Sequence, residues 1–232
     1  HFAIPQTFLV ICGMGNNGGD GLALTRLLIR EGYSAKAIVL KHREQFSEDT
    51  STNFKRLHQL APENIEILEP GSFITEVPGE IILIDALFGN GINRALSGWV
   101  AAFVNEINTL ANTKISIDLP SGLPADTLPE QNAAVVESDY TLSLQFYKRS
   151  FLHAESEKYT GEVKILDIEL SSRFIEGNHS KCRLTDLEDI RKNYKPRDRF
   201  GHKGTFGTAV LIGGTFGKIG AIALSTKAAL RA

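Results

Sequence analysis

The chain has 232 residues, of which 42% are hydrophobic and 22% are charged, and its formal net charge is −2. This composition excludes a disordered tail or a fibre and provides enough material for one large domain or two small ones. The near-neutral charge gives no broad basic field for nucleic acid or a membrane surface, so small-molecule chemistry is the expected activity.

Short β-branched and apolar runs alternate with stretches of helical period, a pattern that predicts an α/β sandwich with a mostly parallel sheet. We expect a first strand over 7–12 and a first helix over 21–31, which Gly32 ends. The elements that follow are predicted as a strand over 35–40, a helix over 48–60, strands over 65–68 and 81–86, a helix over 97–110, and strands over 114–118, 140–144 and 163–168.

The composition turns polar around 176–180, and we place a domain boundary near residue 178. Beyond it the sequence predicts a helix near 184–193, a strand over 209–212 and a helix over 220–231. These elements are too few to bury a core by themselves. We expect them to pack on something else or to begin a domain that continues, and the first residue, which is not Met, suggests that the sequence starts inside a longer chain.

The two cysteines, Cys12 and Cys182, have no CxxC partner that would suggest a metal site or a redox pair. A reducing cytosol fits them, and Cys12 ends an apolar run as a small buried hydrophobe would. No apolar run is long enough to span a membrane, and the start lacks the features of a signal peptide. We therefore expect a cytoplasmic protein.

Three loops follow predicted strands, over 13–21, 85–94 and 118–122. Because the carboxyl ends of parallel strands share one edge of the sheet, where ligands bind, we expect Asp85, Asp118 and the glycine loop to converge on one pocket. Either aspartate alone could be a turn residue. Two of them at equivalent strand ends favour a binding role, since buried carboxylates are costly unless they bind something.

The first loop satisfies GxGxxG, and its amides at a helix start would attract an anion such as phosphate, although a tight strand-to-helix turn also explains the glycines. Dinucleotide dehydrogenases have an acidic residue about 20 positions further on. Here Lys41, His42 and Arg43 occupy that place, where they could hold a 2′-phosphate or form a solvated loop. An NADP-dependent oxidoreductase therefore stays open as an alternative.

Three motifs together resemble the NAD(P)H-hydrate epimerase family: the decapeptide CGMGNNGGDG at 12–21, IDALFG at 84–89 and IDLPSG at 117–122. The resemblance covers roughly residues 7 to 170 and extends the expected domain over 1–178. It implies a Rossmann-like three-layer fold that interconverts the R and S forms of hydrated NADH or NADPH, in which water has added at C6 of the nicotinamide. Asn90 stands where a small hydroxyl residue is more usual in the family.

The resemblance also implies a potassium ion with side-chain ligands Asn17, Asp85 and Ser121, which are hard oxygen donors suited to a hard cation. Asp118 is the expected acid and base of the reaction. The substrate contacts that the resemblance implies are Asn16, Asn17, Gly18, Gly19, Asp20, Gly89, Asn90, Gly91, Ile92, Asn93, Arg94, Ala95 and Asp118.

Two further residues have alternative interpretations. Asp20 could take part in catalysis, but we interpret it as an N-terminal helix cap. Lys148 resembles a lysine that the family often has near this point, and we interpret it as a surface residue and leave it out of the predicted site.

The segment from Gly201 to Ala221 resembles the start of the ribokinase-like, ADP- or ATP-dependent NAD(P)H-hydrate dehydratase, which follows the epimerase in bifunctional proteins. We assign 179–232 to this truncated start and expect it to be inactive. Members of the family usually have helices ahead of the first strand, and we expect these to be missing from this sequence because its first strand is expected to begin at residue 7. The resemblance also implies a homo-oligomer. A non-catalytic scaffold of this fold, binding a nucleotide or RNA, is a second alternative, although scaffolds would be expected to lose the Asp and Asn set.

Overall fold

The structure is a computed structural model that describes residues 6–74, 76–92, 94–178, 182–196, 198–202, 204–205 and 207–231. The chain divides into two compact units, His1–Gly177 and Asn178–Ala232. The candidate site lies in the first unit.

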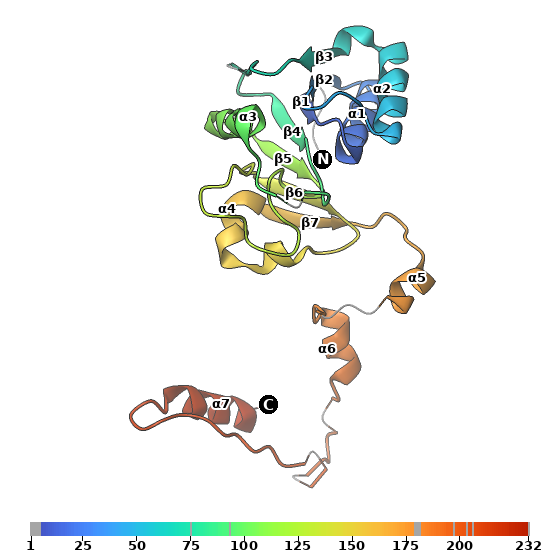
Figure 1. Cartoon of the computed structure of the whole chain (residues 1–232). Helices are drawn as coiled ribbons and strands as arrows, with labels where there is room; N and C mark the ends of the chain where they lie inside the picture. The colour runs from blue at the N-terminus through green and yellow to red at the C-terminus, as the bar shows by residue number, and fades with distance from the viewer. Residues whose placement is uncertain are drawn as a thin grey trace. The chain divides into compact units, whose positions relative to one another are not determined.

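The first unit is built on a sheet of seven strands in the order β3-β2-β1-β4-β5-β6-β7 (Figure 1). Every adjacent pair is parallel, so the predicted α/β sandwich is confirmed with a wholly parallel sheet. The strands are β1 (Thr7–Cys12), β2 (Ser34–Leu40), β3 (Ile65–Leu68), β4 (Ile82–Ala86), β5 (Lys114–Ile117), β6 (Tyr140–Leu144) and β7 (Glu162–Leu166).

Helices cover both faces of this sheet. The apolar sides of α1 (Asn16–Arg30) and α2 (Glu48–Leu60) pack on one face, and α3 (Gly98–Thr109) packs on the other. Shorter helical turns follow as η1 (Pro62–Asn64), η2 (Arg149–Leu152), η3 (Ala154–Ser156), α4 (Glu157–Thr160) and α5 (Ser172–Gly177).

Alternate residues of β1 belong to opposite halves of the core. Val10 and Cys12 join the cluster under α1 and α2, whereas Leu9 and Ile11 join the cluster under α3. A parallel strand covered on both faces needs apolar side chains at every position, which is why the central strands could be recognised as continuous apolar runs. Cys12 is fully buried, as expected for a small hydrophobe.

Two boundaries differ from the prediction in ways that matter for the site. Helix α1 begins at Asn16, not at residue 21, so the second half of the glycine loop forms its first turn. Strand β5 ends at Ile117, because Asp118 leaves the extended conformation at a φ of 65°.

The second unit contains α6 (Leu187–Asn193), which a capping box at Asp186 begins, and α7 (Gly220–Arg231). The strand expected over 209–212 is wrong: these residues have no strand partner in the described part of the unit, and the Val210 and Ile212 side chains are exposed. A lone extended run cannot form a sheet. A ribokinase-like architecture therefore does not follow from this unit.

Candidate active site

The carboxyl ends of β1, β4 and β5 lie next to one another at one edge of the sheet, and the turns that follow them are in close contact. The Gly13 amide donates to the Ala86 carbonyl at 3.0 Å. A β-carbon on Gly13 would stand 1.9 Å from the Leu87 carbonyl oxygen, so glycine is required for this approach. The predicted convergence of the glycine loop with the strand-end aspartates begins with this contact.

The glycine turn is held against the start of α2. The Thr50 hydroxyl donates to the Gly15 carbonyl at 2.7 Å, and the Ser47 amide donates to the Met14 carbonyl at 2.9 Å. A β-carbon on Gly19 would stand 2.9 Å from the Thr50 hydroxyl. Gly15 is the N-cap of α1 and makes no side-chain hydrogen bond to the helix. The first backbone amides of α1 are therefore free to bind an anion at the site.

Asp20 is not a helix cap, and that interpretation is wrong. Since α1 starts at Asn16, Asp20 lies in its second turn, beyond the reach of the cap position. Its side chain keeps contact with solvent, yet partial burial raises its pKa, and the charges of Asp118 and Asp49 raise it further. Asp20 and Asp118 are therefore electrostatic neighbours.

Asp85 lies at the centre of a buried polar network, with only 4% of its surface exposed. Its Oδ1 accepts hydrogen bonds from the Leu87 amide at 3.1 Å and the Ser121 hydroxyl at 2.5 Å. Its Oδ2 accepts from the Ser116 hydroxyl and the Ser121 amide, each at 2.8 Å. Burial raises the pKa of Asp85, and these hydrogen bonds oppose that shift.

Asn17 and Ser121 reach the same neighbourhood through the turn after β4. The Ser121 hydroxyl accepts from the Phe88 amide at 2.9 Å. A β-carbon on the next residue, Gly89, would stand 3.3 Å from the Asn17 side chain. The Asn17 Nδ2 is buried and has no hydrogen-bond partner in the described chain. The structure therefore brings together Asn17, Asp85 and Ser121, the three residues expected to bind a cation.

Asp118 forms an ion pair that was absent from the predicted site. Its Oδ1 lies 2.8 Å from the Lys148 ammonium, and the two side chains are only 12% and 13% exposed. The same oxygen accepts from the Leu144 amide at 3.2 Å, while Lys148 also donates to the Leu144 carbonyl at 3.1 Å. The interpretation of Lys148 as a surface residue is wrong. Its position just after β6, at the same sheet edge, is the signal that could have identified it.

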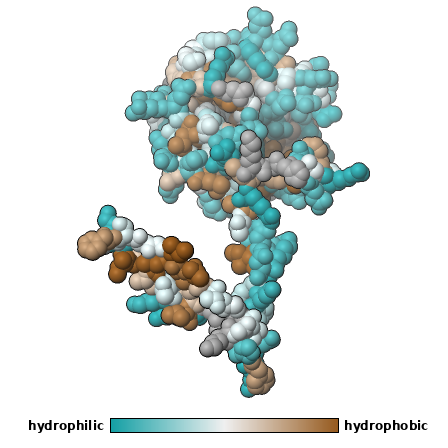
Figure 2. Space-filling model, turned by 60° about the horizontal axis from the view of Figure 1, so that its bottom comes forward, coloured by the Kyte–Doolittle hydropathy of each residue, from teal (hydrophilic) through white to brown (hydrophobic). Residues whose placement is uncertain are grey.

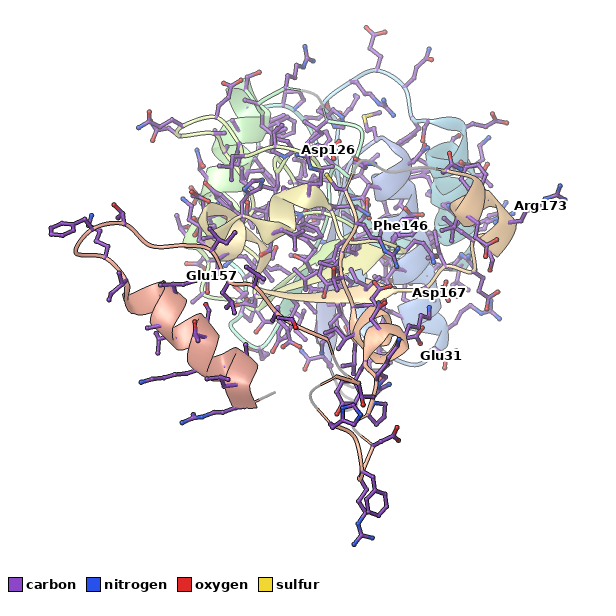
Figure 3. All side chains as sticks on the ribbon, turned by 90° about the horizontal axis from the view of Figure 1, so that it is seen from below. Glu31, Asp126, Phe146, Glu157, Asp167 and Arg173 are labelled. Carbon is purple, nitrogen blue, oxygen red and sulfur yellow. The ribbon has the colours of Figure 1, made fainter. Side chains whose placement is uncertain are left out.

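The loop after β4 forms one wall of a cavity of about 310 Å³. Four of the predicted substrate contacts line it: Asn90, Ile92, Arg94 and Ala95. The other lining residues come from the 122–133 loop, which carries Asp126 (Figure 3). Asn93 lies outside the described residues.

The basic residues after β2 have partners within the protein. Lys41 pairs with Glu69 at 2.7 Å, Arg43 donates to the Met14 carbonyl, and the His42 ring packs on Phe88. Nothing in this arrangement specifically favours the 2′-phosphate of an oxidoreductase cofactor.

None of the helices in the described residues has the length and hydropathy that a membrane span needs. The described residues also contain no group of three or more His, Cys, Asp or Glu side chains placed to hold a metal ion.

Comparison with known proteins gives consistent matches. The family described as "YjeF-related protein N-terminus" matches residues 3–150. Proteins named "Bifunctional NAD(P)H-hydrate repair enzyme" from Moorella thermoacetica and Escherichia coli are 31% and 30% identical, over 98% and 97% of this chain. These alignments cover 43% and 42% of the relatives, so the chain spans less than half of their length.

Among solved structures, the crystal structure of yeast ynu0 has the same fold. It superimposes with a TM-score of 0.55 at 22% identity, over 85% of this chain and 74% of the yeast chain.

Proposed function

Because this chain belongs to the family of YjeF-related protein N-termini, we propose that its site interconverts the R and S forms of hydrated NADH and NADPH. The relatives that match nearly the whole chain are named as NAD(P)H-hydrate repair enzymes, which supports a small-molecule substrate of this class. The protein would act as an epimerase in metabolite repair.

The observation that carries this proposal is the buried ion pair between Asp118 and Lys148 at the sheet edge, beside the glycine turn. Asp118 is fixed there by its backbone and by two donors to one oxygen, which leaves Oδ2 without a protein partner in the described chain. Proton transfer to or from a substrate requires an oxygen that is held in place and is not already hydrogen-bonded to the protein.

The reaction needs little more than proton transfer. The C6 hydroxyl of the hydrate is next to the ring nitrogen, whose lone pair expels the hydroxyl as water once an acid supplies a proton. The product is a planar iminium ion. Water then adds to either face of C6 while a base removes its proton, which restores the hydrate in either configuration.

We assign proton transfer to Asp118, with Lys148 as the residue that positions it. Asp20 is a second candidate proton donor, because its raised pKa keeps it protonated to higher pH than an ordinary aspartic acid. The other proposed substrate contacts are Asn16, Asn17, Gly18, Gly19 and the described loop residues Gly89 to Ile92, Arg94 and Ala95. The helix amides at 16–19 would suit the phosphates.

A potassium ion fits the residues around Asp85. The Asp85 carboxylate has no cationic partner in the described chain, and burial of such a charge is costly without a counter-charge. Its carboxylate, the Ser121 hydroxyl and the Asn17 amide would supply hard oxygen ligands, and rotation of the unpartnered Asn17 amide would present its oxygen. When bound, the ion would supply positive charge near the substrate phosphates.

We further propose that 179–232 is the start of a dehydratase domain, which would need ADP or ATP when complete. The support is that the relatives named as bifunctional align over 97–98% of this chain, including this segment. A cytoplasmic homo-oligomer without nucleic-acid or membrane partners completes the proposal, supported by the cysteine usage and the net charge of −2.

The test is a coupled assay. The protein is mixed with purified R-form hydrate and a separate S-specific dehydratase, with and without potassium, and recovery of reduced nicotinamide is followed by absorbance. We expect potassium-dependent recovery that exceeds spontaneous epimerisation. Asp118→Asn should slow the enzymatic rate at least about 100-fold.

Lys148→Met provides the second arm, because it removes the ammonium that positions Asp118 and keeps the Asp118 carboxylate itself. It should lower kcat and change the shape of the pH–rate profile, whereas a purely structural role would lower activity equally at all pH values. Full activity of Asp118→Asn with intact substrate binding would contradict the assignment.

A further inference from the structure

The turn that follows strand β6 has an unusual backbone. Gln145 has a φ of 63°, in the left-handed region that residues with a side chain seldom adopt. The Phe146 amide donates to the Leu144 carbonyl at 2.7 Å, two residues back, which closes a three-residue turn around Gln145. A three-residue turn with a positive central φ is rare and strained, so other contacts must hold it in place.

The contacts that hold this turn come from β7 and the chain just beyond it, beside β6 at the end of the sheet (Figure 1). The Gln145 amide donates to the Leu166 carbonyl at 2.7 Å. Its side-chain Oε1 accepts from the Ile168 amide at 2.9 Å. A glycine could adopt the same φ without strain, but it could not make the second contact. The Gln145 side chain therefore fastens the turn to the end of β7.

The turn presents both backbone groups of Leu144 to the proposed catalytic ion pair. The Leu144 amide donates to Asp118 Oδ1 at 3.2 Å, and the Leu144 carbonyl accepts from the Lys148 ammonium at 3.1 Å. The same ammonium lies 2.8 Å from Asp118 Oδ1. If β6 continued in the extended conformation, four residues would carry Lys148 roughly 13 Å beyond Leu144. The bend at Gln145 ends this extension and lets the chain return Lys148 to Asp118.

We propose that Gln145 is a positioning residue for proton transfer by Asp118. It acts through the Lys148 ammonium and the Leu144 amide, so this role rests on the proposed epimerase function. Loss of the Oε1 contact would free the turn to relax toward the extended conformation that most residues favour. The Lys148 ammonium would then leave Asp118, while the helix amides at 16–19 would stay in place. The expected result is a lower kcat with little change in KM.

The test compares the whole chain with Gln145→Ala and Gln145→Met, which both remove the Oε1 acceptor, although the methionine keeps the length of the side chain. In the coupled epimerase assay each should lower kcat at least about tenfold and change KM less than about threefold, since a small displacement of a catalytic group is costly. In the Lys148→Met background the same substitutions should lower kcat less than about threefold further, because the residue that they displace is already gone. A purely structural role would lower activity by the same factor in both backgrounds.

A second measurement needs no substrate. The Lys148 ammonium is paired and its side chain is only 13% exposed, so its hydrogens should exchange slowly enough to give a ¹H–¹⁵N NMR signal that is absent from Lys148→Met. This signal should be lost in both Gln145 variants. The matched control is Glu169→Ala, because Glu169 is also left-handed, with a φ of 59°, but is exposed and lies beyond β7. It should change neither the signal nor kcat.

The two measurements distinguish a failure of the proposed function from a failure of this assignment. If the parent has no epimerase activity, the proposed function fails, and the ammonium signal alone decides whether Gln145 places Lys148. If the parent is active and the Gln145 variants keep both its kcat and the Lys148 signal, Gln145 does not position the ion pair. The same conclusion follows if Gln145→Ala lowers kcat equally with and without Lys148.

Discussion

Asp118 has a backbone conformation that is rare for residues with a side chain. Its φ of 65° lies in the left-handed region, which costs about 1 to 2 kcal/mol for most residues. Its amide donates to the Leu142 carbonyl at 2.8 Å, and its carboxylate receives the Leu144 amide and the Lys148 ammonium. These contacts offset the cost and turn the side chain away from the path of β5, so the local strain serves to aim one carboxylate.

The raised pKa of Asp20 gives a prediction about stability and pH. The folded protein holds this proton more tightly than the unfolded chain does. Asp20 therefore contributes stability below its ordinary pKa of 3.8, and this contribution is lost as the pH rises through the higher, folded-state pKa. Asp20→Asn should raise the melting temperature at neutral pH and should lose this advantage as the pH falls toward 3.8.

Thermal melts of both proteins across this pH range would measure the effect. If Asp20→Asn lowered the melting temperature at neutral pH, the carboxylate would be making a favourable contact that outweighs its partial burial and the repulsion from Asp118 and Asp49.

At the scale of elements, α1 depends on glycines where helix propensity alone would prefer alanine. A β-carbon on Gly21 would stand 2.6 Å from the Ala86 β-carbon and 2.8 Å from the Cys12 sulfur. Both neighbours are fully buried and cannot move aside. Gly21→Ala should gain about 1 kcal/mol of propensity but lose more to overpacking, for a net loss of about 1 to 2 kcal/mol in the free energy of unfolding.

Urea unfolding of the parent and the variant would check this value. Gly79→Ala is the control, because a β-carbon there meets nothing within 4 Å. It should change the free energy of unfolding by less than about 0.5 kcal/mol. Equal stability of Gly21→Ala and the parent would mean that α1 can move away from the sheet.

The packed glycines of α1 also explain why its start could not be predicted from the sequence, although other elements could. The central strands are apolar on both faces, and helices such as α2 have a regular apolar period, so both were recognisable. The start of α1 was not, because Gly18 and Gly19 have low helix propensity. Glycine is used there for close packing: a β-carbon on Gly18 would stand 1.8 Å from the Gly13 carbonyl oxygen.

The part of the candidate site that lies at the ends of strands could be predicted from the sequence. Asp85 is the last residue but one of β4, and Asp118 follows the neighbouring parallel strand β5, so topology alone brings them to one edge. Lys148 reaches Asp118 only through the turn after β6, in which its ammonium donates to the Leu144 carbonyl. No spacing rule predicts such a turn, because its shape depends on contacts with other elements.

At the scale of the whole molecule, the two units differ in how their apolar residues are placed. The first unit buries three hydrophobic clusters around its sheet. In the second unit no described residue is buried, and large side chains such as Phe216, Ile212 and Leu230 are exposed. Figure 2 shows brown, hydrophobic residues gathered on the part of this unit that holds α7 and the segment before it. Without a core, this unit has little free energy to resist local opening.

Limited proteolysis should therefore separate the two units. Chymotrypsin is expected to cut at exposed aromatic and leucine residues beyond residue 178 and to leave a resistant fragment close to 1–177, identified by mass spectrometry over time. The fragment should keep the melting temperature of the first unit, because its buried clusters all lie within it. A parallel digest in urea shows that the protected bonds are cleavable once unfolded. Survival of 178–232 for as long as the sheet-containing fragment would contradict the prediction and would mean that its apolar side chains are covered in solution.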